Sequence, residues 1–147
     1  MSSRVVKAPG TPCPGPFACL GSDHAAVGIP VLGVDDLPRA ETFWTKALGL
    51  RPTGEWVNEN WRTLSGEDGP VLALMRSETP VQRHPRVHLD LFVDSAEEQA
   101  AETARLVALG AVQVDWELYP EDPDFVVLAD PEGNVFCIVD LGHGAAN

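Results

Sequence analysis

Basic residues are scarce in this sequence. Lys and Arg number 10 against 22 Asp and Glu, which leaves a formal net charge of −12 over 147 residues. A surface of that sign repels the phosphates of nucleic acids and of anionic membranes, so neither is expected as a partner. The same charge attracts cationic small molecules, although acidic surfaces also serve simply to keep proteins dissolved.

Long apolar runs are missing as well. No stretch of 18 apolar residues occurs, which excludes a membrane-spanning helix, and the N-terminal segment has no continuous apolar core typical of a secretory signal. Cysteine is limited to Cys13, Cys19 and Cys137, an odd number that makes no disulfide framework. The sequence therefore predicts a protein of the reducing cytoplasm.

Residues 1–27 are predicted to form a tail without regular structure. Four prolines and two glycines fall between residues 9 and 16, where they remove backbone donors and favour irregular chain. Residues 142–147 are expected to be a short C-terminal tail. With 44% hydrophobic residues overall, the intervening segment 28–141 is long and apolar enough for a single domain.

Within residues 28–141, the same order of predicted strands and helices occurs twice. The apolar run 29–34 predicts a buried strand, and apolar residues at helical spacing predict a helix from 37 to 48, between the acidic cap Asp36 and Gly49. Strands are expected near 55–57, 61–65 and 71–75, followed by a linker at 77–85. The second series comprises a strand at 86–93, a helix at 95–109 and strands near 112–117, 124–129 and 134–141.

The amino-acid sequence repeats together with the order of predicted strands and helices. Residues 40–49 match residues 101–110 at six of ten positions, and residues 60–75 lie over residues 124–139 without a gap. Similarity between two alanine-rich helices arises easily by chance, but the second match in the same order favours duplication. Two equivalent half-sheets are expected, and each alone would bury too little hydrophobic surface to be stable.

The duplicated unit resembles the vicinal oxygen chelate superfamily, which includes glyoxalase I, the extradiol dioxygenases and the bleomycin-resistance proteins. The resemblance rests on Val-Asp-Asp-Leu entering the first helix at Leu37, on residues 87–94, and above all on Asp-Pro-Glu-Gly-Asn at 130–134 before an alternating strand. It implies an α+β fold in which two βαβββ modules, 28–76 and 86–141, form a curled mixed sheet around a cleft. Because such proteins commonly pair, it also implies a homodimer.

In this superfamily, metal-using members take ligands from the first and last strands of both modules. Registration of the repeat places Ile29, Ala73, His88 and Cys137 at those positions. Two hydrocarbon side chains cannot bind a metal, so the usual metal mechanism is not expected and no cofactor is predicted. A divalent metal held by His88, Asp90 and Cys137 is the alternative.

Strand alternation then predicts which residues face the cleft. His88 and Asp90 are the candidate acid–base pair, although both could equally bond to neighbouring strands. Trp44 is expected in the core, whereas Trp56 and Trp116 could belong to a rim, an interface or the core, and Tyr119 to a lid or plain surface. The predicted ligand-binding residues are Trp61, Thr63, Met75, Phe92, Phe125 and Cys137.

Three functions remain open at this point. The first is a metal-free protein that binds a small organic ligand, cationic or aromatic, as implied by the resemblance to bleomycin-resistance proteins. The second is a lyase, isomerase or dioxygenase-type enzyme that uses His88 and Asp90 or an irregular metal site. The third is a partner-binding domain whose cleft is filled.

Overall fold

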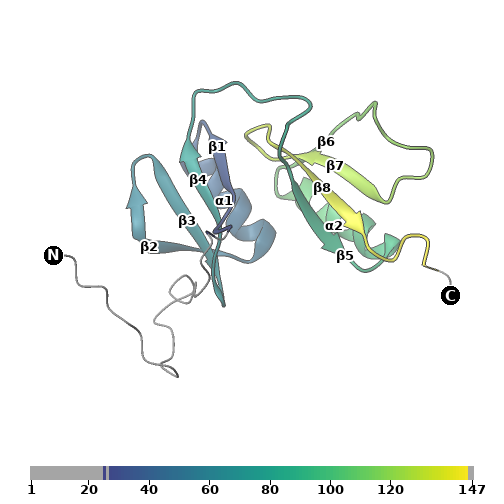
Figure 1. The fold of residues 1–147 in the computed structure, drawn as a ribbon, viewed down its shortest axis with the longest axis horizontal. Helices are drawn as coiled ribbons and strands as arrows, with labels where there is room; N and C mark the ends of the chain where they lie inside the picture. Colours follow the sequence, from purple (N-terminus) through teal and green to yellow (C-terminus); the bar gives the residue numbers. More distant parts are fainter. Residues whose placement is uncertain (1–24, 26, 146–147) are drawn as a thin grey trace.

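Two copies of one strand–helix–strand–strand–strand unit build the molecule (Figure 1). The computed structural model describes residue 25 and residues 27–145, without the side chains of residues 54–57. Most of the predicted tail, with Cys13 and Cys19, and the side chain of Trp56 lie outside this description. The first module contains β1 (Val31–Val34), α1 (Leu37–Leu48), β2 (Arg51–Asn58), β3 (Trp61–Gly66) and β4 (Gly69–Arg76). The second module contains β5 (Leu89–Val93), α2 (Ala96–Ala108), β6 (Val112–Gln113), β7 (Phe125–Ala129) and β8 (Val135–Asp140).

Each module forms its own four-stranded mixed sheet, with strand orders β1-β4-β3-β2 and β5-β8-β7-β6. The first strand of each module runs parallel to the last, and the remaining neighbours are antiparallel. The registers also correspond, because Val31 lies opposite Ala73 in the first sheet where Asp90 lies opposite Cys137 in the second. The predicted α+β class with two βαβββ modules is confirmed.

Helix α1 begins and ends where its local sequence predicts. The Asp36 carboxylate accepts a hydrogen bond from the Arg39 backbone N–H (2.9 Å), and Gly49 closes the helix at φ 63°, in the left-handed region that favours glycine. One stripe of the helix is buried against the sheet, as its apolar spacing predicts. The buried stripe consists of Leu37, Ala40, Phe43, Trp44 and Ala47.

Helix α2 begins with a variant of the predicted capping box. The Ser95 hydroxyl accepts from the Glu98 backbone N–H (3.2 Å), as in the standard motif. The Glu98 carboxylate accepts in return from the backbone N–H of Asp94 (3.0 Å), one residue before the cap. The two bonds therefore satisfy one free donor of the first turn, at Glu98, and the N–H of Asp94 just before the helix.

Two strands of the second module are shorter than predicted. Strand β5 begins at Leu89, so His88 directly precedes it, and β6 covers only Val112–Gln113. After a last bond from the Val114 N–H to the Val127 carbonyl (3.0 Å), the chain leaves the sheet. Pro120 and Pro123 supply no N–H for a longer ladder. Residues 114–124, hereafter the pocket loop, connect β6 to β7 as an irregular segment instead.

The hydrophobic core is continuous across the two modules. Trp44 on α1 is 1% exposed and packs edge-on against Phe136 on β8, with ring centroids 5.2 Å apart. Its indole N–H donates to the Asp130 carboxylate (3.0 Å), which confirms the predicted core position of Trp44. On the outside, the Arg105 guanidinium of α2 donates to the Ala47 carbonyl at the end of α1 (2.7 Å).

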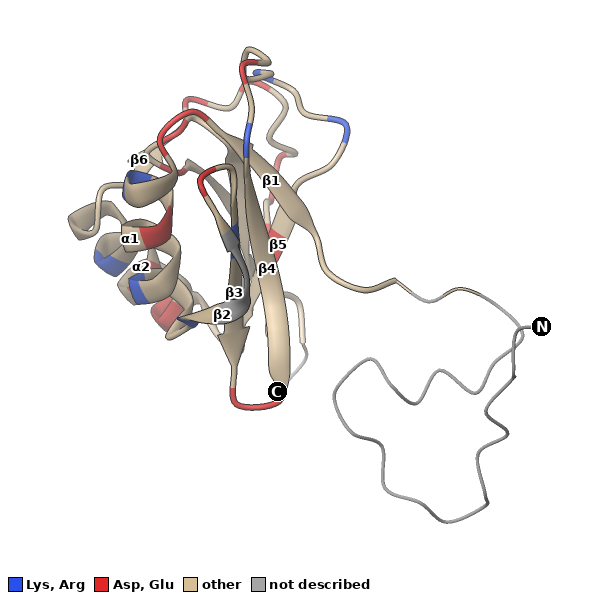
Figure 2. Ribbon diagram, turned by 90° about the vertical axis from the view of Figure 1, so that its left-hand side faces the viewer, with Lys and Arg blue, Asp and Glu red and all other residues tan. Residues whose placement is uncertain are grey.

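The helices and the sheets form two layers. Figure 2 shows α1 and α2 together on one side of the molecule and β1 to β5 on the other. The sheet faces opposite the helices are therefore left to form any binding site. Neither helix in the described part of the chain has the length and apolar content needed to cross a membrane.

Candidate ligand-binding pocket

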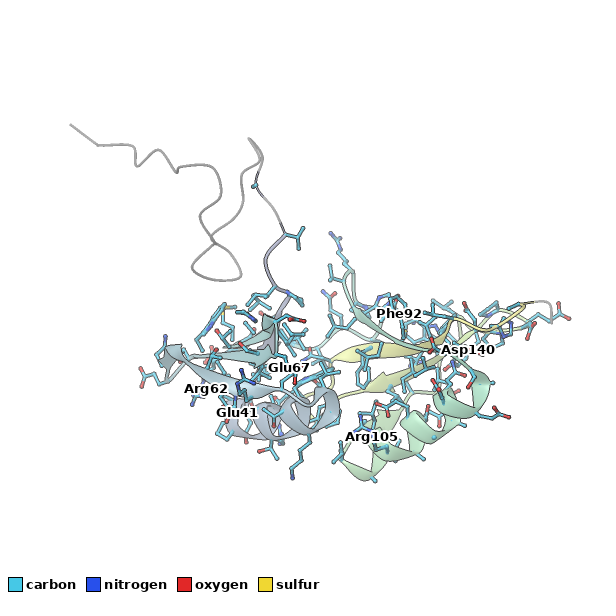
Figure 3. All side chains as sticks on the ribbon, turned by 90° about the horizontal axis from the view of Figure 1, so that it is seen from below. Glu41, Arg62, Glu67, Phe92, Arg105 and Asp140 are labelled. Carbon is cyan, nitrogen blue, oxygen red and sulfur yellow. The ribbon has the colours of Figure 1, made fainter. Side chains whose placement is uncertain are left out.

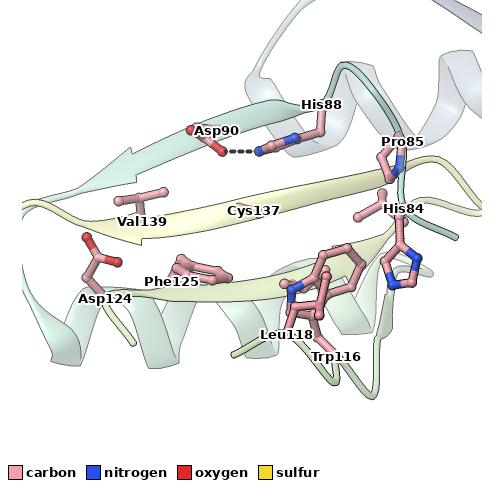
Figure 4. Close-up of a pocket in the computed structure, with 12 residues that line it drawn as sticks. His84, Pro85, His88, Asp90, Trp116, Leu118, Asp124, Phe125, Cys137 and Val139 are labelled. Carbon is pink, nitrogen blue, oxygen red and sulfur yellow. Dashed lines mark ion pairs between the residues drawn. The ribbon is translucent and has the colours of Figure 1, made fainter. Parts of the chain in front are cut away.

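A hollow of about 510 Å³ lies on the face of the second sheet that points away from the helices (Figure 4). Its floor is made by β7 and β8, and its sides come from the start of β5, the end of the linker and the pocket loop. Ligand pockets in proteins commonly fall in this size range. It is lined by His84, Pro85, His88, Asp90, Trp116, Leu118, Asp124, Phe125, Val127, Val135, Cys137 and Val139.

The polar part of this pocket is a cluster of three side chains. The His88 Nε2 lies 3.1 Å from the Asp90 Oδ1, and Figure 4 shows the two side chains pointing toward one another. Cys137 lies opposite Asp90 on β8, and the donor atoms of His88, Asp90 and Cys137 all lie within 4.8 Å of one another. The Asp90 carboxylate therefore contacts an imidazole and lies close to a thiol.

Cys137 is a neutral thiol at physiological pH. Burial raises its pKa to about 11, and the nearby Asp90 carboxylate acts in the same direction. A thiol is a strong nucleophile only as the thiolate. The pocket thus favours Cys137 as a small buried donor over Cys137 as an attacking group.

Aromatic side chains form the wall opposite this polar cluster. The Tyr119 ring lies against the Phe125 ring, with centroids 5.3 Å apart, and the Tyr119 hydroxyl accepts from the Val127 backbone N–H (2.7 Å). Tyr119 therefore fastens the pocket loop to β7. At the mouth, the His84 ring packs edge-on against Trp116 at 4.9 Å.

Ion pairs join the linker to the pocket loop. Glu117 lies 2.8 Å from the Arg83 guanidinium and 3.0 Å from the His84 Nε2. A hydrogen bond from its own backbone and the Arg83 bond together lower the pKa of Glu117. The mouth of the pocket is therefore built by two segments that are tied to each other.

Negative and neutral groups surround the pocket. Among its lining residues, Asp90 and Asp124 are acidic, and neither Lys nor Arg is present. The imidazoles of His84 and His88 are the groups there that can become positive, and each already faces a carboxylate. The pocket is suited to a neutral or cationic ligand more than to an anion.

The structure brings four of the predicted site residues into this pocket, namely His88, Asp90, Phe125 and Cys137. Phe92 lies two residues after Asp90 on β5 and points away from α2 (Figure 3), but it is 64% exposed and does not line the hollow. The remaining three predicted residues, Trp61, Thr63 and Met75, lie on β3 and β4 of the first sheet.

The first module holds these three residues in a different setting. The Trp61 indole N–H donates to the Thr63 hydroxyl (2.9 Å), and Met75 is 43% exposed. The register of the repeat correctly predicted that Trp61 and Phe125 occupy equivalent positions. It did not show that this pocket is built by the second module and the end of the linker, without the first sheet.

Five lining residues that lie outside the strands were missed from the sequence as binding residues, because no local pattern predicts the path of their loops. Trp116 and Leu118 belong to the pocket loop, which carries large apolar side chains on an acidic, proline-bounded segment. That combination is a usable signal, since exposed aromatic residues in loops often serve binding. The other three are His84, Pro85 and Asp124.

The four-ligand metal site of the superfamily does not fit these residues. Ala73 is fully buried opposite Val31 on the first sheet, where neither side chain has a donor atom, and Ile29 is likewise a hydrocarbon. In the second module, donor atoms of His88, Asp90 and Cys137 lie within 4.8 Å of one another. Any metal would be held by this second group.

Known proteins match the chain in family and in fold. A family model described as glyoxalase-like domain matches residues 30–139. No curated protein matches this sequence. Among solved structures, a glyoxalase/bleomycin resistance protein/dioxygenase family enzyme from Burkholderia phytofirmans PsJN is 19% identical, with 77% of this chain and 96% of that chain covered and a TM-score of 0.62.

Two further solved structures share this fold, but their names describe different activities. Lactoylglutathione lyase from Agrobacterium tumefaciens is 20% identical over 85% of this chain and 100% of its own, with a TM-score of 0.57. A fosfomycin resistance protein from Listeria monocytogenes, in complex with Mn(II) and dihydroxypropylphosphonic acid, is 14% identical over 79% and 90%, with a TM-score of 0.61. Duplicated modules and family match together show that the chain belongs to the glyoxalase-like domain family of the vicinal oxygen chelate superfamily.

Proposed function

We propose that this protein binds a small organic ligand, aromatic and neutral or cationic, in the pocket of the second module without the four-ligand metal of its superfamily. The chemical make-up of the pocket walls carries the proposal. Aromatic and aliphatic side chains supply contact area, the Asp90 and Asp124 carboxylates supply negative charge, and no Lys or Arg lines the hollow. Ligand pockets typically combine such apolar walls with a few placed polar groups.

The acidic lining argues against an anionic ligand like that of the fosfomycin resistance protein. That protein was captured with a phosphonic acid and Mn(II). In the metal-free pocket a phosphonate would meet the Asp90 and Asp124 carboxylates, and no Lys or Arg lines the hollow to offset the repulsion. Bleomycin-resistance-type sequestration of a cationic aromatic compound agrees better with these walls and with the net charge of −12.

Isothermal titration calorimetry tests this proposal. Cationic aromatic antibiotics, with a neutral and an anionic aromatic compound of similar size, are titrated into metal-free protein. Binding of the cationic or neutral compounds and not of the anion is expected, and Phe125→Ala should weaken it by about 10-fold or more. Phe92→Ala is the matched control, because Phe92 shares the sheet face outside the hollow. Absence of heat with every compound would count against the proposal.

The His88–Asp90 pair favours an enzyme as a second candidate. Its 3.1 Å contact lies at the pocket surface, where a bound ligand can exchange a proton with it. A lyase or isomerase reaction needs such a group, and one structural neighbour is named a lyase. Turnover that His88→Ala abolishes, while calorimetry still shows ligand binding, would establish this candidate. Binding without turnover of any tested compound would leave the sequestration function.

We also propose that the protein forms a homodimer in the cytoplasm, with no nucleic-acid or membrane partner. The first sheet leaves Val31, Val71 and Met75 between 43% and 44% exposed, so an apolar face is available for burial against a second copy. Light scattering at micromolar concentration should give twice the 15.8 kDa chain mass, about 32 kDa. A mass near 16 kDa would remove the dimer.

A further inference from the structure

Three donor groups of different chemistry converge at one side of the pocket. His88 and Asp90 are two residues apart at the start of β5, and Cys137 lies opposite Asp90 on β8. Each offers one ligand atom, and these atoms all lie within 4.8 Å of one another. Among the residues that the structure describes, no second group of three or more such side chains occurs.

We infer that His88, Asp90 and Cys137 form a three-donor Zn²⁺ site that belongs to the second module alone. Bonds of about 2.0–2.3 Å to a tetrahedral zinc ion place neighbouring ligand atoms roughly 3.3–3.8 Å apart. The His88 Nε2 and Asp90 Oδ1 already lie 3.1 Å apart, and both side chains are nearly half exposed. They can therefore adjust toward the buried Cys137 sulfur without disturbing the core.

The chemical types of the three donor atoms determine which metal ion the site favours. Imidazole and thiolate ligands suit zinc and related transition metals, whereas Mg²⁺ and Ca²⁺ require oxygen ligands. Three protein ligands also leave a fourth position of the tetrahedron for water or for a ligand atom, as in zinc sites that bind small molecules. Because all three donors line the pocket, that fourth position faces the hollow.

This three-donor site differs from the metal site of the superfamily, which takes ligands from both modules. The equivalent residues of the first module are Ile29, Val31 and Ala73, all hydrocarbon, so the first module adds no ligand. Asp90 supplies the third donor instead, two residues after His88 and opposite Cys137. The inference goes beyond the proposed ligand binding, which depends on the apolar walls and is measured in metal-free protein.

Zinc competition titration of the full chain tests the inference. The protein is first stripped with a chelator, and Cys13 and Cys19 are replaced by serine so that Cys137 is the remaining thiol. One Zn²⁺ per chain should bind in competition with a chromophoric zinc chelator, and Mg²⁺ should not. Substituted Co²⁺ should show the charge-transfer absorption of a cobalt–thiolate bond, which reports ligation by Cys137 directly.

The first module supplies matched substitutions for the three donors. His88→Ile, Asp90→Val and Cys137→Ala each install the residue that the repeat already accommodates at the equivalent position. Cys137→Ala should abolish the cobalt–thiolate band. Each change should weaken zinc binding by more than the roughly 10- to 100-fold that loss of an outer-shell partner causes.

The control is His84→Ala, which removes another pocket histidine beside a carboxylate and should leave zinc binding unchanged. Circular dichroism verifies that each variant is folded. Failure to bind one Zn²⁺ per chain, or unchanged zinc binding in both His88→Ile and Cys137→Ala, would overturn the inference. Binding of the organic compounds to metal-free protein is measured separately, so its outcome stays distinct from this one.

Discussion

Burial, with a smaller contribution from Asp90, sets the reactivity of the Cys137 thiol. Burial and the neighbouring carboxylate raise the thiol pKa to about 11, so the thiolate fraction at pH 8 is on the order of one in a thousand. We predict that iodoacetamide modifies Cys137 much more slowly in the metal-free native protein than in the unfolded chain. The rate should rise as the pH approaches 11. Mass spectrometry of the peptide that contains Cys137 gives this rate without interference from other thiols.

Asp90→Asn separates the two causes of the raised pKa. Removal of the negative charge should lower the pKa of Cys137 and speed its alkylation at pH 8, while burial of the sulfur remains. Equal rates in the native protein, the Asn variant and the unfolded chain would contradict a buried thiol beside a carboxylate.

Trp44 joins the two modules through a hydrogen bond as well as through packing. Its indole N–H donates to the buried carboxyl group of Asp130. Burial raises the pKa of Asp130, although the hydrogen bonds that this group accepts act in the opposite direction. Trp44→Phe keeps a ring against Phe136 but removes this donor and leaves a small cavity. We predict a loss of about 1–3 kcal/mol in the free energy of unfolding, measured in urea. A loss below about 0.5 kcal/mol would show that the bond contributes nothing.

At the scale of single elements, helix α1 depends on a residue of the other module. The Glu132 carboxylate, with a side chain that is 2% exposed, accepts from the backbone N–H groups of Asp35 (2.9 Å) and Asp36 (3.1 Å) and from the Arg39 guanidinium (2.7 Å). Glu132→Gln keeps the shape but replaces one acceptor oxygen with an amide donor. We predict a loss of about 1–3 kcal/mol in unfolding free energy at pH 7.

The pH dependence of this contact has a defined sign. Burial alone would raise the pKa of Glu132, but the bonds from Arg39 and the two backbone donors outweigh it, so the pKa lies below its usual value. The stabilisation is therefore present above the unfolded-state pKa of about 4.3 and is lost as the pH falls through the lower folded-state pKa. The difference between the native protein and Glu132→Gln should shrink below about pH 4. An equal difference at pH 7 and pH 3.5 would contradict this account.

Gly49 allows a clean measurement of backbone strain at the end of α1. Its φ is 63°, and no atom lies within 4 Å of the position that a Cβ would occupy. Gly49→Ala should therefore cost about 1–2 kcal/mol through conformation alone. Gly49→Asn should cost less, because asparagine tolerates the left-handed region. Urea unfolding of both variants checks the order, and an alanine variant as stable as glycine would refute it.

Local patterns predicted the elements better than they predicted the pocket. Asp36, Gly49 and Ser95 act within a few residues of their own position, so their helices begin and end near the expected places. The repeat predicted that Trp61 and Phe125 are equivalent, and their strand registers agree. Alternation gives the face of a strand and not the distance along it, so it could not separate Phe92 from the pocket. The path of the pocket loop depends on tertiary contacts such as the Tyr119 hydrogen bond.

At the scale of the whole molecule, the two modules depend on one core. Phe43 and Trp44 of the first module pack against Phe136 of the second, with ring centroids 6.3 and 5.2 Å away. Arg105 and Glu132 of the second module add polar contacts to both ends of α1. Separation of the modules would expose these rings and leave the buried Asp130 without its indole donor. A stable single module is therefore not expected.

We predict that the modules unfold together. In native-state hydrogen exchange, the most protected amides of β4 and β8 should report the same free energy of opening. Phe136→Leu, a change in the second module, should lower both values by a similar amount, about 1–2 kcal/mol. Val112→Ala is a control on the same module, since Val112 is 63% exposed and should leave both values nearly unchanged. If Phe136→Leu lowered the β8 value alone, the modules would be independent folding units and the shared core would not couple them.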